Sequence, residues 1–151
     1  MLGKSEDLVT DGAKPVKLAG GFKFTEGPAM GPDGNVYFTD IPNNRVHKWD
    51  LKAKKVSVFM EKSGGANGLF FSKEGDLFAC QGVSQRVTSF YLEDGGEKEL
   101  LADQYDGRPF NKPNDLWVHP NNGVFFSDPN YGRKDLSQDG EHLYFITPYR
   151  D

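Results

Sequence analysis

The sequence "EGPAMGPDGNVYFTD" at residues 26–40 returns twice, as "NGLFFSKEGDLFACQ" at 67–81 and "NDLWVHPNNGVFFSD" at 114–128. The three copies align without a gap. Each begins with Glu or Asn, continues through an apolar run and a turn (PDGN, KEGD or PNNG), and ends in a second apolar run. The copies begin 41 and 47 residues apart. A repeat of about 40 to 50 residues built from strands and turns is typical of a β-propeller, in which each repeat forms one four-stranded blade.

Further strands follow each copy, as alternating apolar and polar residues indicate. Residues 45–50 and 55–60 follow the first copy, 86–92 and 97–102 follow the second, but only 142–147 follow the third. Residues 14–20, by contrast, precede the first copy and have no copy of their own. We therefore predict an all-β fold in which residues 14–151 form three four-stranded propeller blades. Residues 14–20 would be the outer strand that completes the last blade, and residues 1–13 a flexible arm.

Three blades cannot close a ring, because propellers have about four to eight blades. An open half-ring would leave two apolar faces in water. Two copies of the chain would give six blades, so a homodimer closed around a two-fold axis is one prediction. The alternative is that the chain is part of a longer one. The offset of one strand favours the homodimer.

The composition bears on partners and location. A net charge of −4 and the lack of a basic stripe exclude the usual nucleic-acid interface. No run approaches the roughly 18 to 20 apolar residues that a membrane span needs, so no membrane partner is expected. The opening residues lack the apolar segment of a signal peptide, which predicts a cytoplasmic protein.

A few single residues predict core positions. Cys80 is the only cysteine, so no internal disulfide can form, and its apolar neighbours predict a buried thiol. Trp49 and Trp117 fall within strand patterns and are predicted to lie in the blade core.

Glu26, Asn67 and Asn114 occupy the same position of the three copies, at the start of the innermost strand. In a propeller these strand starts converge on one mouth of the central channel. Carboxylate and amide oxygens are the ligands that calcium prefers, with water completing six to eight. In a two-fold dimer two Glu26 carboxylates would face each other, which favours a bound cation. Asn67 and Asn114 are also ordinary turn residues, so a purely structural role stays open for both.

The phrases "FTEGPAMGPDGNVYFTD", "GGANGLFFSKEGDLFAC" and "KPNDLWVHPNNGVFFSDPNYG" resemble the gluconolactonase-like, senescence-marker-protein (SMP-30) type of lactonases. The resemblance covers roughly residues 20–147. It implies a six-bladed propeller that holds a divalent metal, usually calcium, and hydrolyses sugar lactones and related esters. It also implies that Glu26 and Asn114 are metal ligands. Members of that family are about twice as long, and the ligands from their later blades have no counterpart here.

The remaining candidate site residues lie around the third copy. Asp128, in "SDPNYG", and Asp115 are the candidate catalytic residues, although strand alternation would turn Asp115 away from the metal unless the turn is irregular. Asp128 is equally suited to forming a turn. Lys112, Asn130 and Tyr131 are the candidate substrate-binding residues, with a surface position as the alternative for Lys112.

Two functions are therefore candidates. The first, which the resemblance implies, is a calcium-dependent hydrolase of sugar lactones or related esters, in which Asp128 or the Glu26 of a second copy would act as base. The second is a half-propeller scaffold that self-associates and binds a metal but turns over no substrate.

Overall fold

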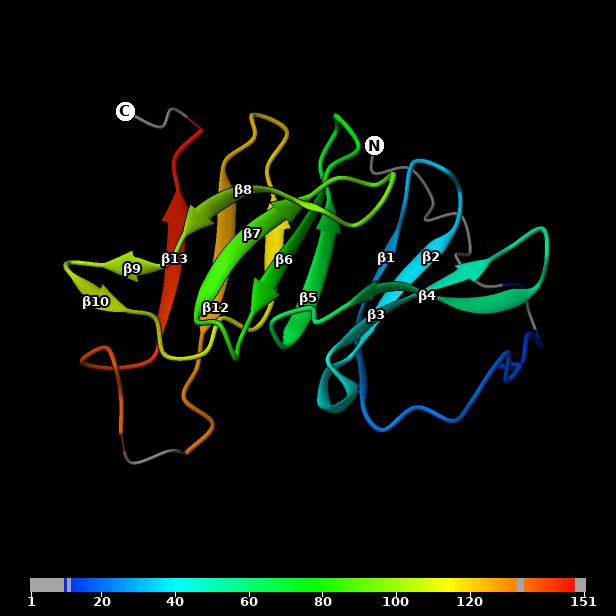
Figure 1. The fold of residues 1–151 in the computed structure, drawn as a ribbon, viewed down its shortest axis with the longest axis horizontal. Helices are drawn as coiled ribbons and strands as arrows, with labels where there is room; N and C mark the ends of the chain where they lie inside the picture. The colour runs from blue at the N-terminus through cyan, green and yellow to red at the C-terminus, as the bar shows by residue number, and fades with distance from the viewer. Residues whose placement is uncertain (1–9, 11, 133–134, 149–151) are drawn as a thin grey trace, which may run out of the picture.

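The computed structural model describes residues 10, 12–132 and 135–148 of the 151-residue chain. Across these residues the fold is all-β, with three antiparallel sheets, a two-stranded hairpin and one short 3-10 turn, η1 (Ile41–Asn43). The sheets stand side by side in chain order (Figure 1). In every sheet the strands are hydrogen-bonded in sequence order, as in a propeller blade. We call the sheets blade 1, blade 2 and blade 3.

Two blades have four strands and the third has three. Blade 1 contains β1 (Thr25–Met30), β2 (Val36–Asp40), β3 (Arg45–Asp50) and β4 (Lys55–Glu61). Blade 2 contains β5 (Ala66–Phe71), β6 (Leu77–Gln81), β7 (Arg86–Phe90) and β8 (Glu97–Ala102). Blade 3 contains β11 (Leu116–Val118), β12 (Val124–Asp128) and β13 (His142–Ile146). The strands predicted to follow the three copies are therefore confirmed, with ends that differ by at most two residues.

The hairpin between blades 2 and 3 was not predicted. It pairs β9 (Gln104–Tyr105) with β10 (Arg108–Pro109). The two residues between these strands, Asp106 and Gly107, have φ values of 50° and 73°. An Asp-Gly pair in this conformation is the usual two-residue hairpin turn, so the sequence did carry the signal.

The apolar core lies between neighbouring blades because alternate residues of each strand face opposite neighbours. On β6, Leu77 and Ala79 pack against blade 1, whereas Phe78 and Cys80 pack against blade 3. Cys80 is fully buried, and burial raises the pKa of its thiol. The predicted buried thiol is thus confirmed.

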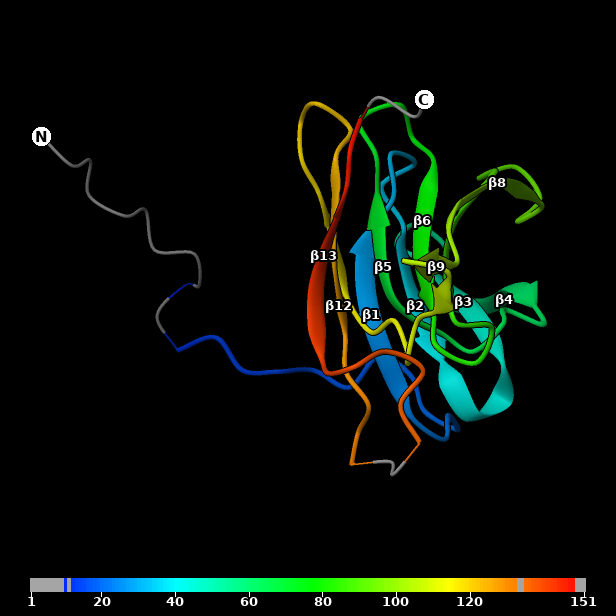
Figure 2. The ribbon, with the colours of Figure 1, turned by 90° about the vertical axis from the view of Figure 1, so that its left-hand side faces the viewer.

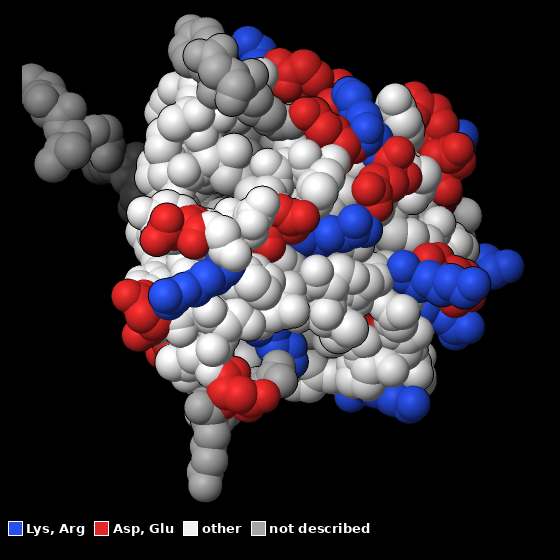
Figure 3. Space-filling view, turned by 60° about the vertical axis from the view of Figure 1, so that its left-hand side comes forward, with Lys and Arg blue, Asp and Glu red and all other residues white. Residues whose placement is uncertain are grey.

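The outer face of blade 3 is apolar and exposed. Trp117, which we expected in the core, is 48% exposed and lies beside Phe125, with ring centroids 5.9 Å apart. It faces away from blade 2 because its neighbours Leu116 and Val118 take the inward positions of β11. Figure 3 shows this side of the molecule, where uncharged side chains form broad areas between groups of charged residues. Trp49 lies partly buried on the opposite outer face, that of blade 1.

Residues 14–20 form no strand in the single chain (Figure 2), and Leu18 and Ala19 line the hollow on the outer face of blade 1. Their role as a closing strand therefore stays a prediction. The arm predicted for residues 1–13 falls mostly outside the described residues, as do positions 149–151 of the predicted propeller domain. Among the residues that the structure describes, no helix is long and apolar enough to cross a membrane. The cytoplasmic location stays a prediction.

Candidate functional site

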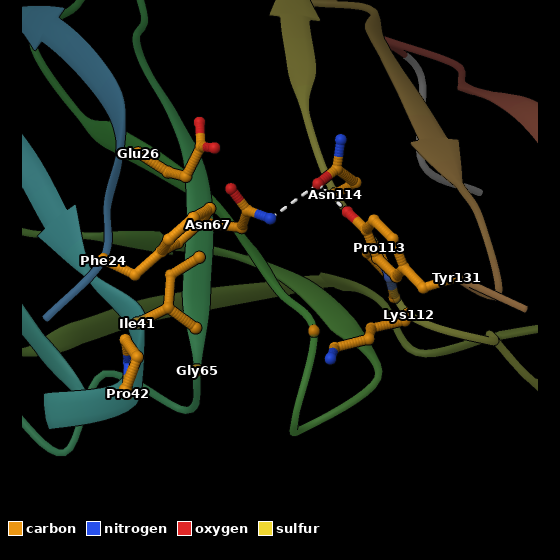
Figure 4. Close-up of a pocket in the computed structure, with 11 residues that line it drawn as sticks. Phe24, Glu26, Ile41, Pro42, Gly65, Asn67, Lys112, Pro113, Asn114 and Tyr131 are labelled. Carbon is orange, nitrogen blue, oxygen red and sulfur yellow. Dashed lines mark hydrogen bonds between the residues drawn. The ribbon is translucent and has the colours of Figure 1, made fainter. Parts of the chain in front are cut away.

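The innermost strands of the three blades bring Glu26, Asn67 and Asn114 to one pocket of about 340 Å³ (Figure 4). We call these three residues the column. The blade 1 side of the pocket is apolar, formed by Phe24, Ile41 and Pro42. The blade 3 side carries Lys112, Pro113, Asn114 and Tyr131. Polar groups from three blades thus converge at one pocket, and their role as metal ligands stays a prediction.

Close contact between the innermost strands depends on a glycine after each of the first two column residues. A Cβ on Gly27 would lie 2.1 Å from the Asn67 carbonyl oxygen, and one on Gly68 would lie 2.6 Å from the Asp115 Cα. Gly27 also has a φ of 53°, a backbone conformation that residues with a Cβ disfavour. The backbones can approach this closely only because both positions lack a side chain.

Irregular strand pairing aims the first two column residues into the pocket. The β1–β2 register shifts between Glu26 and Ala29, and the β5–β6 register shifts between Ala66 and Leu69. Such bulges re-aim side chains and are frequent beside functional sites. Pro28 lacks the N–H that a regular ladder needs, which explains the first bulge.

Asn114 is held differently, because it lies two residues before β11. Its N–H donates to the Ser127 carbonyl (2.9 Å), and its carbonyl accepts from the Gly68 N–H (2.7 Å). The first bond holds Asn114 to β12 within blade 3, and the second ties the start of blade 3 to blade 2. The predicted strand-start position therefore applies to Glu26 and Asn67, whereas Asn114 precedes its strand.

A hydrogen-bonded chain links the column to Tyr131. The Asn67 Nδ2 donates to the Asn114 Oδ1 (2.6 Å), and the Tyr131 hydroxyl donates to the same oxygen. Tyr131 has a φ of 54°, a conformation that residues other than glycine rarely adopt. Burial and the negative charge of Glu26 raise the pKa of Tyr131, so its hydroxyl stays protonated at neutral pH.

Lys112 lines the same pocket, and its role in substrate binding stays a prediction. Its Nζ is 5.4 Å from the centroid of the Tyr131 ring, a cation–π distance. Gly82 leaves room for its stem, because a Cβ there would lie 2.9 Å from the Lys112 Cγ. The pocket therefore holds one cationic group opposite the Glu26 carboxylate.

Asp128 lies away from the pocket and is fully buried. Its Oδ2 accepts the Asn111 N–H (2.7 Å), and its Oδ1 accepts the Lys112 N–H (2.6 Å). Burial raises the pKa of this carboxyl, and the two hydrogen bonds offset the shift only in part. The carboxylate thus positions the segment that carries Lys112 and Asn114. Its predicted catalytic role has no contact with the pocket to support it.

The other two candidates differ in their distance from the column. Asp115 is exposed and lines a second hollow, of about 280 Å³, that the column residues also border. Its Oδ1 accepts the Leu116 N–H (2.9 Å). Asn130 borders a separate hollow instead, and its side-chain oxygen accepts the Gly132 N–H (2.6 Å). The structure therefore brings Asp115 to the column and leaves Asn130 outside the main pocket.

The column fits a hard cation in the type of its donors but not in their number. It offers one carboxylate and two amide oxygens, and calcium takes six to eight oxygen ligands. The Asn114 oxygen also accepts two hydrogen bonds that a cation would have to displace. In the described part of the chain, no three His, Cys, Asp or Glu side chains group as a metal site.

The family model of the SMP-30/gluconolactonase/LRE-like region matches residues 24–150. The chain belongs to this family. A gluconolactonase from Zymomonas mobilis is 28% identical over 147 residues, which cover 87% of this chain and 41% of that protein. The family resemblance read from the column phrases is confirmed.

Solved structures agree with this assignment. The structure of a proposed gluconolactonase is 33% identical, with a TM-score of 0.84 over 94% of this chain and 51% of that one. A gluconolactonase from Xanthomonas campestris is 25% identical, with a TM-score of 0.78 over 84% of this chain and 45% of that one. A calcium-binding regucalcin from Agrobacterium tumefaciens, 20% identical, shares the fold with a TM-score of 0.64 over 83% and 46% of the two chains. The chain spans about half the length of these relatives.

Proposed function

We propose that this chain hydrolyses sugar lactones or related esters at the column pocket. In this proposal Glu26, Asn67 and Asn114 hold a divalent cation, for which calcium is the first candidate. The convergence of these three side chains from three blades carries the proposal. Membership of a gluconolactonase-like family supports the reaction class. The calcium-binding relative of the same fold supports the choice of cation.

A cation bound at the column would polarise the lactone carbonyl and stabilise the negative charge that develops on its oxygen. Glu26 provides the charge that retains the cation, and the two asparagine amides orient around it. For Asn114 to act as a ligand, the Tyr131 hydroxyl must turn away from its Oδ1. That hydroxyl is then free to donate to an oxygen of the substrate.

Lys112 and Asp115 have distinct roles in this proposal. The Lys112 ammonium, held over the Tyr131 ring, binds hydroxyls of the lactone and the carboxylate of the opened product. Asp115, exposed beside the column, is the nearer candidate for the base that takes a proton from the attacking water. The Glu26 of a second copy is the alternative base.

A second candidate function is a cation-binding scaffold that turns over no substrate. The observation in its favour is that the column contains one carboxylate and that both oxygens of Asp128 are occupied by backbone N–H groups. This function predicts cation binding at the same residues without hydrolysis.

Hydrolysis of gluconolactone, measured with calcium and with a chelator, distinguishes the two. We expect calcium-dependent turnover that Glu26→Gln lowers at least tenfold, while Glu93→Gln, at an exposed site outside the pocket, leaves it unchanged. Turnover that persists in Glu26→Gln contradicts the lactonase proposal. Cation binding without turnover in the wild type supports the scaffold.

A further inference from the structure

The residue two positions before each column residue also reaches the pocket. These residues are Phe24, Gly65 and Lys112, and all three line it. We call them the rim. The column is nearly uniform, with one acid and two amides, whereas the rim has an aromatic ring, no side chain and an ammonium group at equal positions of the repeat. The rim therefore gives the pocket two chemically different sides.

The blade 1 side of the rim is a fixed apolar surface. Phe24 is 56% exposed, although its side chain is aromatic. Its N–H donates to the Asp40 Oδ1 (3.1 Å), and its carbonyl accepts the Ile41 N–H (3.1 Å). Figure 4 shows the Phe24 and Ile41 side chains together on one side of the pocket. The backbone of Phe24 is thus held in place while its ring is left open to a ligand.

Blade 2 has no side chain at the two equivalent positions. The bond from the Ile41 N–H to the Phe24 carbonyl recurs in blade 2, where the Gly82 N–H donates to the Gly65 carbonyl (3.1 Å). Both glycines are buried and line the pocket. Gly65 also has a φ of 68°, which favours glycine. The pocket is therefore left open between its apolar side and its blade 3 side.

The blade 3 side of the rim is cationic. The Lys112 N–H donates to the Asp128 Oδ1 (2.6 Å), as the Phe24 N–H donates to Asp40. In Figure 4 the Lys112 side chain lies across the pocket from Phe24. An ammonium group attracts the oxygens of an ester and, more strongly, those of a carboxylate. A ligand that meets both sides needs an apolar group at one end and oxygens at the other.

We propose that the pocket prefers lactones and esters with an alkyl or aryl group, which packs on Phe24 and Ile41 while the ester oxygens face the column and Lys112. This inference rests on the proposed function and narrows its substrate class. Ligand pockets measure about 300–1,000 Å³. This pocket, at about 340 Å³, therefore fits one ring with a short substituent.

The reaction itself is ordinary hydrolysis. The oxygen of one water bonds to the carbonyl carbon, the ring C–O bond breaks, and the ring oxygen takes a proton. The product is a hydroxy acid whose carboxylate carries the negative charge. Lys112 is the group of the rim that attracts this carboxylate.

Two lactones with the same six-membered ring test the preference, because δ-octalactone carries a propyl group that δ-valerolactone lacks. We expect the kcat/KM of δ-octalactone to be at least about tenfold higher, since methylene groups in an apolar pocket increase specificity. Phe24→Ala should lower the ratio of the two kcat/KM values at least about threefold. The matched control is Leu51→Ala, at a position that is 51% exposed in the turn between β3 and β4. A ratio that Phe24→Ala leaves unchanged overturns the inference.

A binding measurement separates this inference from the activity. Hexanoate and acetate are carboxylates that differ in their alkyl groups and cannot be hydrolysed. In ligand-observed NMR with calcium, we expect hexanoate to bind at least about tenfold more tightly than acetate. Phe24→Ala should remove most of that difference, and Lys112→Met should weaken the binding of both. Binding that Lys112→Met leaves unchanged overturns the assignment of the cationic side.

The two measurements together have distinct outcomes. Tighter binding of hexanoate that depends on Phe24, in a protein that hydrolyses no lactone, contradicts the proposed activity and supports the preference for an apolar group. Turnover of gluconolactone together with equal binding of hexanoate and acetate supports the activity and overturns the preference.

Discussion

Two sets of polar residues recur in this repeat, and the structure uses them differently. Glu26, in the column, is exposed at a pocket, whereas Asp40 and Asp128, at the ends of the second strands, are 1% and 0% exposed. Asp40 accepts the N–H groups of Lys23 and Phe24 (3.1 to 3.3 Å), as Asp128 accepts those of Asn111 and Lys112. Each buried aspartate thus fixes the segment that leads into a column residue. An acid that holds backbone N–H groups shapes the fold, and an acid that faces a pocket is available to a ligand.

Removing the buried carboxylate should have the largest effect. Asp128→Ala leaves two backbone N–H groups without their partner, so we expect the free energy of unfolding to fall by about 2–5 kcal/mol. Urea denaturation at fixed protein concentration measures this. The control Asp103→Ala, at an exposed site, should stay within about 0.5 kcal/mol of the wild type. Equal loss in both variants would contradict the positioning role.

Removing the positive charge of Lys112 should weaken substrate binding and leave the free energy of unfolding unchanged. Lys112→Met keeps a stem of similar length without the ammonium that lies over Tyr131. We expect the KM for gluconolactone to rise about tenfold, as the loss of one charged hydrogen bond implies. Steady-state kinetics measures it, with Lys73→Met at an exposed position as the control. An unchanged KM places the substrate elsewhere.

The Tyr131 hydroxyl should compete with a cation for the Asn114 oxygen. Tyr131→Phe keeps the ring beside Lys112 and removes the donor, which is worth about 0.5–1.5 kcal/mol. We therefore expect calcium to bind roughly 2- to 10-fold more tightly, as measured by calorimetry. Tyr105→Phe, outside the pocket, should bind calcium as the wild type does. Weaker binding in Tyr131→Phe would make the hydroxyl a ligand or its support.

The two buried aspartates should respond oppositely to pH. Burial alone would raise the pKa of Asp40, but bonds from the Phe24 N–H, the Asn43 side chain and the Lys23 N–H bring it below its usual value. Its stabilisation is therefore present above the ordinary pKa of about 3.9 and lost as pH falls through the folded value. The pKa of Asp128 is raised, so its contribution is greatest below the ordinary value and is lost as pH rises through the folded one.

The melting temperatures of Asp40→Asn and Asp128→Asn from pH 7 to 3 test this. The gap between wild type and Asp40→Asn should narrow towards acid, whereas the gap between wild type and Asp128→Asn should widen. If both gaps in melting temperature changed in the same direction with pH, the opposite pKa shifts of Asp40 and Asp128 would be contradicted.

The repeat and the column could be predicted from the sequence because both depend on periodicity. Strand alternation and turn residues determine the blades, and equal positions in the repeat bring Glu26, Asn67 and Asn114 together. The environment of Asp128 could not be predicted, because its partners are backbone N–H groups, which every residue except proline offers. The prediction that Trp117 lies in the core was wrong, because alternation shows which face of a strand is apolar but not whether another blade covers that face.

Two further features of the structure have signals in the sequence. Pro28, one residue after a glycine and inside a strand pattern, indicates an interrupted ladder and hence the bulge at Glu26. The Asp106–Gly107 pair indicates the hairpin before blade 3. The left-handed conformation of Tyr131, which carries its hydroxyl to Asn114, has no such signal because it arises from the packing of the loop.

Calorimetric titration of calcium into the wild type, Glu26→Gln and Glu93→Gln tests most directly whether the column is the functional site. We predict that the wild type and Glu93→Gln bind calcium equally and that Glu26→Gln binds at least tenfold more weakly, with unchanged stability. Equal binding by all three proteins, or no binding by the wild type, would contradict the assignment of the column as a cation site.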